Sequence, residues 1–529
     1  MDIKHTLYQD VISNEDKNKT AIYFRGNKIS YDTLNKNIEK YAKRFIKLNI
    51  KKDTVVAVLS LNIPETIYAF YALNKIGAIC LMLHPQTPIK NLEEALKETK
   101  AEYLIITDIL YSQYHELLKD ADIKTYYVSF INELNFIEKI FFKKNYNSAL
   151  SFIDEAKYID SILEDDIEVE TNTDDLKPSV YLLSGGTTNK SKTIILNDRA
   201  LRFPGSQASE ILGRDFGELS MLGLLPFFHG FGLAMGMHAP LMSHGSIYLM
   251  IKFDIKEIVS GINSNHLNII IAVPYMIEKL LSNKAFTTSK LKNIYMTFVG
   301  ADTLSPTLNQ RYNDLMEKHG SKNRIYEGYG LTETVTVCAV NTFNEHKDGT
   351  VGKVLKGNLI KIVDFDDKNK ELPNGSDGEI LISSVANCLG YLNTDKKNQP
   401  FFVDKNKVTY IATGDIGHLD DDGFIHFKNR MKDVIKIAGY NVYPKDIEAM
   451  VSKIDGVFDA CCIFVDVEHP YIHLYVENHN VDDKTLASTI KKYLEERLLK
   501  YQVPEKITIL PNFPRTSVGK IDKKTLVHF

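Results

Sequence analysis

The residues Thr54-Val55-Val56-Ala57-Val58-Leu59-Ser60 form a short stretch rich in β-branched residues, and Val55–Leu59 within it is an uninterrupted apolar run. The segments that follow have the patterns of a helix, a strand, a helix and a strand, in the order Pro64–Gly77, Ala78–Leu83, Pro88–Thr99 and Tyr103–Thr107. Strands and helices that alternate at this spacing predict a parallel α/β sheet. Apolar runs such as this one and Ile269–Val273 also fit strands that are buried on both faces.

The pattern changes along the chain. Tyr31–Leu48 has the apolar spacing of an amphipathic helix, whereas the polar stretch Tyr111–Asp175 predicts only connecting or peripheral structure. Asp422-Gly423 predicts a hairpin turn. The segments from Pro444 onward predict a small α+β unit with the elements Lys445–Ser452, Ala460–Val465, His473–Val476, Lys484–Leu498 and Lys506–Leu510. We therefore expect a domain boundary near Arg430–Asp433.

Composition narrows the class of protein. The 529 residues are 44% hydrophobic and 25% charged, and they exceed what one hydrophobic core usually serves. The net charge of −4 and the lack of a long basic run argue against a nucleic-acid-binding surface. The five cysteines form no CxxC pair, so reduced thiols in a cytoplasmic protein are expected; they are Cys80, Cys338, Cys388, Cys461 and Cys462.

One segment has the length of a membrane span. Met221–Ile251 contains no Asp, Glu, Lys or Arg, but prolines, histidines and glycines interrupt it. We expect no membrane span here and predict a buried strand, loop and helix close to an apolar pocket.

The first motif with chemical content is Ser184-Gly185-Gly186-Thr187-Thr188-Asn189-Lys190-Ser191-Lys192, which follows a strand-like Val180–Leu183. Paired glycines let backbone amides approach an anion, and hydroxyls and lysines supply donors and charge, as a triphosphate requires. The ending of a Walker A loop is absent. Taken alone, a polar turn explains the composition equally well.

Two further motifs carry a carboxylate. Gly328-Tyr329-Gly330-Leu331-Thr332-Glu333 places a glutamate, a natural Mg²⁺ ligand, behind an aromatic ring that could stack on a base. In Tyr410–Asp415, Asp415 could accept the two hydroxyls of a ribose. Packing and a simple turn are the alternatives.

Two more motifs follow, Asn429–Pro444 and Pro514–Asp522, and the second contains Lys520. In this order the five motifs resemble those of the adenylate-forming superfamily of acyl-CoA synthetases, adenylation domains and firefly-type luciferases. The resemblance covers essentially the whole chain. It implies an α/β fold with a large N-terminal domain of parallel-rich sheets and helices at 1–429. A hinge at 430–433 and a mobile α+β lid at 434–529 would follow.

The resemblance also implies roles for particular residues. The β- and γ-phosphates of ATP would be held by Ser184, Gly185, Gly186, Thr187, Thr188 and Lys192. Asn189 and Ser191 depart from the family's usual Gly and Pro and put catalytic strength in doubt. Further nucleotide-binding residues would be Gly300, Ala301, Asp302, Gly328, Tyr329, Gly330, Asp415, Arg430, Lys436 and Gly439. Tyr329 would stack on adenine, and Asp415 would bind the ribose with help from Arg430.

The implied catalytic residues are Lys520, His229, Thr332 and Glu333. Thr332 would contact the α-phosphate, Glu333 would hold Mg²⁺, and Lys520 would bridge the reacting groups during adenylation. Lys432 matches the family's hinge, about which the lid rotates so that the face carrying Gly439 replaces Lys520 for thioester formation. His229 matches an acyl-pocket motif of CoA ligases.

The sequence indicates the identity of the acid and of the thiol less directly than it indicates the nucleotide-binding residues. The lack of an acidic residue near His229 disfavours an α-amino acid, while Phe227, Phe231, Met235 and Met237 favour an apolar or aromatic acid. The Gly439–Pro444 segment favours CoA as the thiol. The alternatives are a ligase that loads the phosphopantetheine arm of a carrier protein and a nucleotide-binding protein without turnover.

Overall fold

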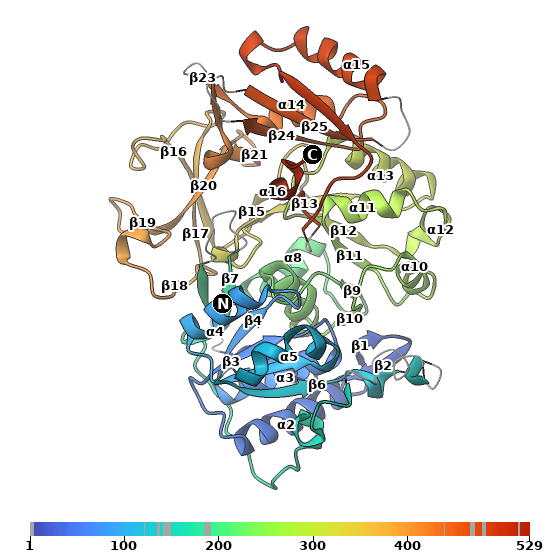
Figure 1. Ribbon diagram of the computed structural model, residues 1–529, viewed down its shortest axis with the longest axis vertical. Coiled ribbons are helices and arrows are strands. Elements are labelled where there is room, and N and C mark those ends of the chain that lie inside the picture. Colours follow the sequence, from blue (N-terminus) through green and yellow to red (C-terminus); the bar gives the residue numbers. More distant parts are fainter. Residues whose placement is uncertain are drawn as a thin grey trace. The chain divides into compact units, whose positions relative to one another are not determined.

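The computed structural model describes residues 5–120, 122–134, 138–140, 150–184, 192–437, 440–465, 471–478, 483–516 and 519–529 (Figure 1). Contacts between residues divide the chain into two compact units. Unit 1 comprises Met1–Ile271, Gly330–Cys338 and Ser384–Phe401, and unit 2 comprises Ala272–Tyr329, Ala339–Ser383 and Phe402–Phe529. The boundaries predicted at 429 and 434 stay predictions.

A seven-stranded sheet lies in unit 1. Its strands are, in order, β18 (Gly390–Tyr391), β8 (Thr193–Asn197), β7 (Pro178–Leu183), β4, β3, β5 and β6 (Lys124–Val128). Its centre is made of β3 (Val55–Leu59), β4 (Ile79–Leu83) and β5 (Tyr103–Thr107), which pair in parallel. The connecting helices are α3 (Pro64–Ile76) and α4 (Ile89–Thr99). The predicted alternation of strands and helices is therefore confirmed. Pro64 begins α3 and Gly77 ends it in a left-handed conformation with φ of 75°, which glycine adopts without strain.

The prediction that Tyr111–Asp175 is only peripheral structure is wrong for its first part. The structure forms α5 (Tyr111–Asp120) and β6 (Lys124–Val128), and β6 pairs in parallel with β5 at the edge of the sheet. An edge strand buries only part of its length, and Lys124 is exposed at its start. Its polar beginning therefore hid it from a pattern based on apolar residues. Beyond β6, the described residues of this segment are α-helical at 138–140 and at 150, form short turns of 3₁₀-helix, and are otherwise irregular.

The core of this sheet lies against α4 and α5. Leu59, Leu81 and Leu104 of the strands pack with Leu92 of α4 and Tyr114 of α5 in one cluster. Helix α2 (Tyr31–Lys47) packs with α3 instead, and the residues on its apolar stripe are fully buried, among them Leu34, Ile38 and Phe45. These layers fix the end of β7 (Pro178–Leu183), from which the first motif emerges.

A second sheet in unit 1 contains, in order, β9 (Ser220–Gly223), β10 (Ser246–Leu249), β1 (Thr20–Phe24) and β2 (Asn27–Ser30). Between β9 and β10 the chain forms a π-helix at Phe231–His238 and the short α9 (Ala239–Met242). The buried strand, loop and helix predicted for Met221–Ile251 are thus confirmed. Among the residues that the structure describes, no helix has both the length and the apolarity that crossing a bilayer requires.

Unit 2 contains β12 (Met296–Val299) and β13 (Ile325–Tyr329), which pair in parallel. Helix α11 (Pro274–Leu281) precedes β12, α13 (Pro306–Lys318) precedes β13, and β14 (Ala339–Val340) and β15 (Lys353–Val354) follow. A five-stranded sheet comes next, made of β16 (Asn358–Val363), β17 (Gly378–Ser384), β19 (Phe401–Val403), β20 (Thr409–Leu419) and β21 (Ile425–Arg430). Strands β20 and β21 meet at the turn that Asp422-Gly423 predicts, and Gly423 has φ of 82°.

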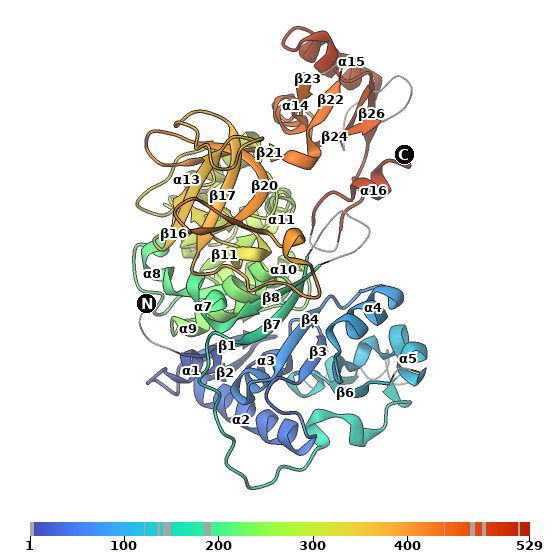
Figure 2. The same ribbon diagram turned by 90° about the vertical axis from the view of Figure 1, so that its left-hand side faces the viewer.

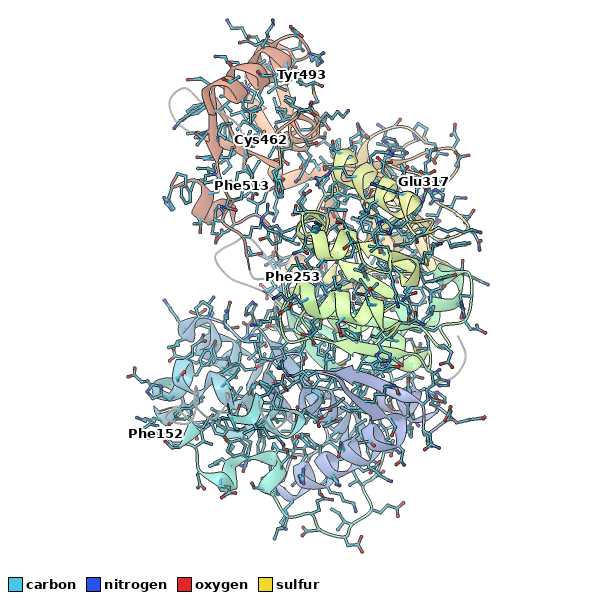
Figure 3. The ribbon with its side chains drawn as sticks, turned by 90° about the vertical axis from the view of Figure 1, so that its right-hand side faces the viewer. Phe152, Phe253, Glu317, Cys462, Tyr493 and Phe513 are labelled. Atoms are coloured by element: carbon cyan, nitrogen blue, oxygen red, sulfur yellow. The ribbon has the colours of Figure 1, made fainter. Side chains whose placement is uncertain are left out.

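The C-terminal end of unit 2 has a hydrophobic core of its own. Strands β24 (Asp459–Val465), β25 (Tyr471–Glu477) and β26 (Lys506–Leu510) form one sheet, beside α14 (Pro444–Val451) and α15 (Asp483–Glu495) (Figure 2). Cys462 and Leu474 of this sheet are buried with Ile447 of α14 and Ile490 of α15, and Figure 3 labels Cys462 there. The α+β elements predicted after Pro444 are confirmed.

A buried ionic cluster ties the N-terminal helix α1 (Leu7–Ile12) of unit 1 to its core. The Asp10 carboxylate accepts two hydrogen bonds from the guanidinium of Arg202 on α7 (Asp198–Ser206), and both side chains are 5% exposed. His238, at the end of the π-helix, lies 3.5 Å from the same carboxylate. Burial alone would raise the pKa of Asp10, but hydrogen bonds from His238 and Arg202 outweigh it and lower that pKa.

We predict that Arg202→Met destabilises the protein by about 3–5 kcal/mol, because it leaves a buried carboxylate without its main partner. Lys36→Met is the control, since Lys36 forms an exposed pair with Asp32 on α2 that contributes about 0.5 kcal/mol or less. Urea unfolding followed by far-ultraviolet circular dichroism measures both effects, since the chain has no tryptophan. Equal unfolding midpoints for the two variants would contradict the prediction.

Candidate functional site

The two ends of the predicted phosphate loop lie together in unit 1. Ser184 follows β7 and Lys192 precedes β8 (Thr193–Asn197), and these two strands pair antiparallel. The backbone N–H of Lys192 donates to the Ser184 hydroxyl at 2.9 Å, and the N–H of Ser184 donates to the Lys192 carbonyl at 2.8 Å. The loop is therefore closed at its base. The predicted residues Gly185, Gly186, Thr187 and Thr188, and the departures Asn189 and Ser191, lie outside the described residues.

Glu333, the predicted Mg²⁺ ligand, is also in unit 1, on a short 3₁₀ turn at Thr332–Thr334. Its carboxylate accepts a hydrogen bond of 2.7 Å from the hydroxyl of Tyr391. The Lys192 ammonium lies 4.3 Å from the centre of the same tyrosine ring. Tyr391 thus joins the phosphate loop to Glu333, and nothing local in the sequence singled it out, because 58 residues separate it from Glu333.

Gly330 is required by a close approach of the backbone. A Cβ atom at this position would lie 1.5 Å from the carbonyl oxygen of Thr336. The N–H of Thr336 in turn donates to the carbonyl of Leu331 at 2.7 Å and closes the turn that carries Thr332 and Glu333. Any larger residue at 330 would displace that turn.

The predicted ribose-binding residues come together in unit 2. The hydroxyl of Tyr329, at the end of β13, donates to Asp415 Oδ2 at 2.8 Å. Arg430 Nε lies 3.3 Å from Asp415 Oδ1, because β20 and β21 place the two residues opposite each other. The Asp415 side chain is 2% exposed, so its charge is compensated by partners and not by bulk water. The ring of Tyr329 is tilted against Phe427 at 6.0 Å.

Lys520 lies on a hairpin of unit 2 and is only partly exposed. The carbonyl of Lys520 accepts from the N–H of Thr516 at 2.7 Å, and Gly519 has φ of 81°, which completes the turn. A small apolar cluster of Phe513 and Leu526 anchors the two sides of the hairpin, and Phe513 is labelled in Figure 3. A lysine in a polar hairpin is most often a solvated surface residue, so the partial burial of Lys520 is informative.

The electrostatic setting of Lys520 includes several predicted site residues. Burial lowers the pKa of Lys520 below its ordinary value. The positive charges of Arg430 and Lys432 act in the same direction, whereas the carboxylates Asp302 and Asp415 act against it. The structure therefore brings the Lys520 ammonium within electrostatic reach of Asp415 and Asp302.

The other predicted nucleotide-binding residues and the predicted hinge residue lie on separate turns of unit 2 or outside the described residues. Ala301 has φ of 71°, so the turn after β12 directs the chain sharply at Gly300–Asp302, and Lys445 lies 3.9 Å from Asp302. Lys432 is exposed on a 3₁₀ turn at Met431–Asp433. Gly439 and the side chain of Lys436 lie outside the described residues.

The predicted acyl-pocket segment of unit 1 is held by a polar residue on the loop before α3. Asn62 donates to the carbonyl of Leu225 at 3.0 Å and accepts from the N–H of Phe227 at 3.3 Å. His229 follows in a turn that leads into the π-helix, and the ring of Phe228 lies 4.3 Å from that of His84. Asn62 and His84 are residues that sequence reasoning did not assign. The sequence carried no local signal for the Asn62 contacts, since 163 residues separate Asn62 from Leu225.

The chain is similar to known ligases along most of its length. It is 27% identical over 512 residues to "Probable 4-coumarate--CoA ligase 3" of Dictyostelium discoideum, covering 93% of this chain and 88% of that protein. It is 26% identical over 524 residues to the 2-succinylbenzoate–CoA ligase of Listeria monocytogenes serotype 4b (strain F2365), covering 96% of each. The crystal structure of ATP-bound MatB from Rhodopseudomonas palustris superposes with a TM-score of 0.84 at 20% identity, covering 99% of this chain and 98% of that one.

The fold therefore matches that of a solved ATP-bound protein over nearly the full length of both chains. The family model described as AMP-binding enzyme matches residues 10–392, which is well over half of the chain. The chain belongs to the AMP-binding enzyme family.

Proposed function

We propose that the chain activates a carboxylic acid with ATP, giving an acyl-adenylate and pyrophosphate, and then transfers the acyl group to a thiol. The setting of Lys520 carries this proposal. A partly buried ammonium lies within electrostatic reach of Asp415, and Asp415 is itself held by Tyr329 and Arg430. An acid-activating enzyme needs a cation of this kind where two anions react.

The first step joins a carboxylate oxygen to the α-phosphorus of ATP and breaks the bond to the bridging oxygen of the β-phosphate. Both reactants are negatively charged, so positioning and charge neutralisation supply most of the rate enhancement. In the proposal, Asp415 fixes the ribose and Lys520 neutralises charge at the reacting oxygens. No covalent intermediate with the protein is required.

Mg²⁺ would assist at the triphosphate end, where it neutralises phosphate charge. Glu333 suits this ion, because a carboxylate is a hard oxygen ligand and Mg²⁺ binds through one or two carboxylates together with substrate phosphates. The hydrogen bond from Tyr391 to Oε1 fixes the direction of the carboxylate. Ser184 and Lys192 at the base of the phosphate loop would contact the phosphates themselves.

The acid is proposed to be apolar or aromatic. The segment between β9 and β10 contains no acidic residue that could pair with a substrate ammonium, and Phe227, Met235 and Met237 of this segment are buried. The two related ligases named above act, by their names, on 4-coumarate and 2-succinylbenzoate, which are both aryl acids. His229, at the start of this segment, is the residue proposed to line the acyl pocket.

CoA is the proposed thiol, and the names of the related ligases support it over a carrier protein. A cytoplasmic location is proposed with it. All five cysteines are buried thiols without a disulfide, as expected for a reducing compartment.

The choice of thiol predicts a specific outcome. With ATP, Mg²⁺ and a panel of aryl and fatty acids, the enzyme should form thioesters with CoA in a mass-spectrometric assay. A phosphopantetheinylated carrier protein offered in place of CoA should react at least about tenfold more slowly, a difference of roughly 1.4 kcal/mol in transition-state stabilisation. Thioester formed only on the carrier protein would contradict CoA as the acceptor while leaving acid activation intact.

We predict that Lys520→Ala abolishes adenylate formation yet spares thioester formation from a synthetic acyl-adenylate and CoA. Lys520 carries the charge for the first half-reaction only, because the predicted lid rotation about Lys432 removes it before the second. Lys524→Ala is the control, since Lys524 is an exposed residue near the same terminus. Both half-reactions can be followed by quenched-flow chromatography, and equal loss of the two would rule out an alternating role.

A further inference from the structure

Tyr391 of unit 1 contacts two residues that the proposed function places at the triphosphate of ATP. Its hydroxyl donates to Glu333 Oε1 at 2.7 Å, and its ring faces the Lys192 ammonium at 4.3 Å. One side chain therefore makes a directed hydrogen bond to the proposed metal ligand and a cation–π contact to the proposed phosphate ligand.

The two contacts of Tyr391 bear on the attraction between the positive charge of Lys192 and the negative charge of Glu333. A lysine and a glutamate that both serve a bound triphosphate and its metal ion attract each other when the nucleotide is absent. A direct ion pair between them would have to be broken before ATP and Mg²⁺ could bind. Tyr391 gives each charge a separate partner, because the ring face attracts the ammonium while the hydroxyl satisfies the carboxylate.

Tyr391 is rigidly held by its neighbours. It lies on β18 (Gly390–Tyr391), which pairs with β8, and β8 is the strand that begins directly after Lys192. The side chain of Gln399 accepts from the N–H of Tyr391 at 2.6 Å and donates to its carbonyl at 3.0 Å. The N–H of Cys388 also donates to the carbonyl of Glu333 at 2.7 Å, which ties the two backbone segments together.

The hydroxyl of Tyr391 is the donor in its contact with Glu333. An ionised carboxylate can only accept a hydrogen bond, whereas a tyrosine hydroxyl can donate one. The hydrogen bond therefore runs from the tyrosine to the glutamate.

We propose that Tyr391 is a positioning residue for the triphosphate end of the site: it orients Glu333 toward Mg²⁺ and holds Lys192 ready for the phosphates. This inference rests on the proposed function. It concerns neither the acid nor the thiol. Loss of Tyr391 should therefore weaken the cooperation between ATP and Mg²⁺ and leave the choice of acid unchanged.

Two variants separate the two contacts. Tyr391→Phe removes the hydroxyl and keeps the ring beneath Lys192, so it should reduce the Mg²⁺-dependent tightening of ATP binding about tenfold, the effect of a hydrogen bond to a charged group. ATP affinity in EDTA should stay within about twofold of wild type, because the cation–π contact is retained. Tyr391→Leu also removes the ring and should weaken metal-free ATP binding about threefold, as expected for a cation–π contact at an accessible site.

Isothermal titration calorimetry with ATP, in EDTA and in excess Mg²⁺, measures these dissociation constants without turnover. Tyr158→Phe is the matched control, because Tyr158 donates to the carboxylate of Asp108 elsewhere in unit 1 and its variant should bind ATP and Mg²⁺ like wild type. Circular dichroism establishes that each variant is folded. Tyr391→Phe decides the test by itself if Tyr391→Leu does not fold.

A Tyr391→Phe protein with the wild-type dependence of ATP binding on Mg²⁺ would overturn this inference. An equal effect of Tyr158→Phe would overturn it too, since the loss would then be a general consequence of removing a tyrosine hydroxyl. Wild-type protein that binds no ATP in either condition would defeat the proposed function itself. The two failures are therefore distinguishable.

Discussion

The segment Gly328–Glu333 is the constraint on which the rest of the site depends. Tyr329 is the last residue of one part of unit 2, and Gly330 is the first residue of a part of unit 1. Within unit 2 the hydroxyl of Tyr329 donates to Asp415, and within unit 1 Glu333 accepts a hydrogen bond from Tyr391. The carbonyl of Thr336 leaves no room for a side chain at Gly330, so the backbone here has little freedom to adjust.

The charges of Asp415 and Lys520 are compensated by neighbouring groups to different extents. Asp415 is almost fully buried and is paired with a hydroxyl and a guanidinium, which offsets the cost of removing a carboxylate from water. Lys520 is less completely compensated, and burial lowers its pKa despite Asp302 and Asp415. An ammonium whose charge is costly to hold is well suited to a reaction that brings additional negative charge to it, because binding of the anionic substrates then stabilises both partners.

Much of the fold could be predicted from the sequence because its signals are local. The alternation around Val55–Leu59 and the Pro64 and Gly77 boundaries of α3 depend on periodicity and on backbone preferences that each residue carries with it. β6 was missed because an edge strand buries little of its length, and the burial of Lys520 could not be foreseen from a polar hairpin. The candidate site was predictable as far as ordered motifs reach, as the pairing of Asp415 with Tyr329 and Arg430 illustrates. Tyr391 and Asn62 escaped prediction, because their partners lie far away in the sequence and only the folded chain brings them together.

Exchange of radiolabelled pyrophosphate into ATP tests most directly whether this chain turns ATP over with an acid. We predict exchange that requires an apolar or aromatic acid and disappears in Lys520→Ala. ATP binding without exchange for any acid of a broad panel would contradict acid activation and would leave a nucleotide-binding protein without turnover.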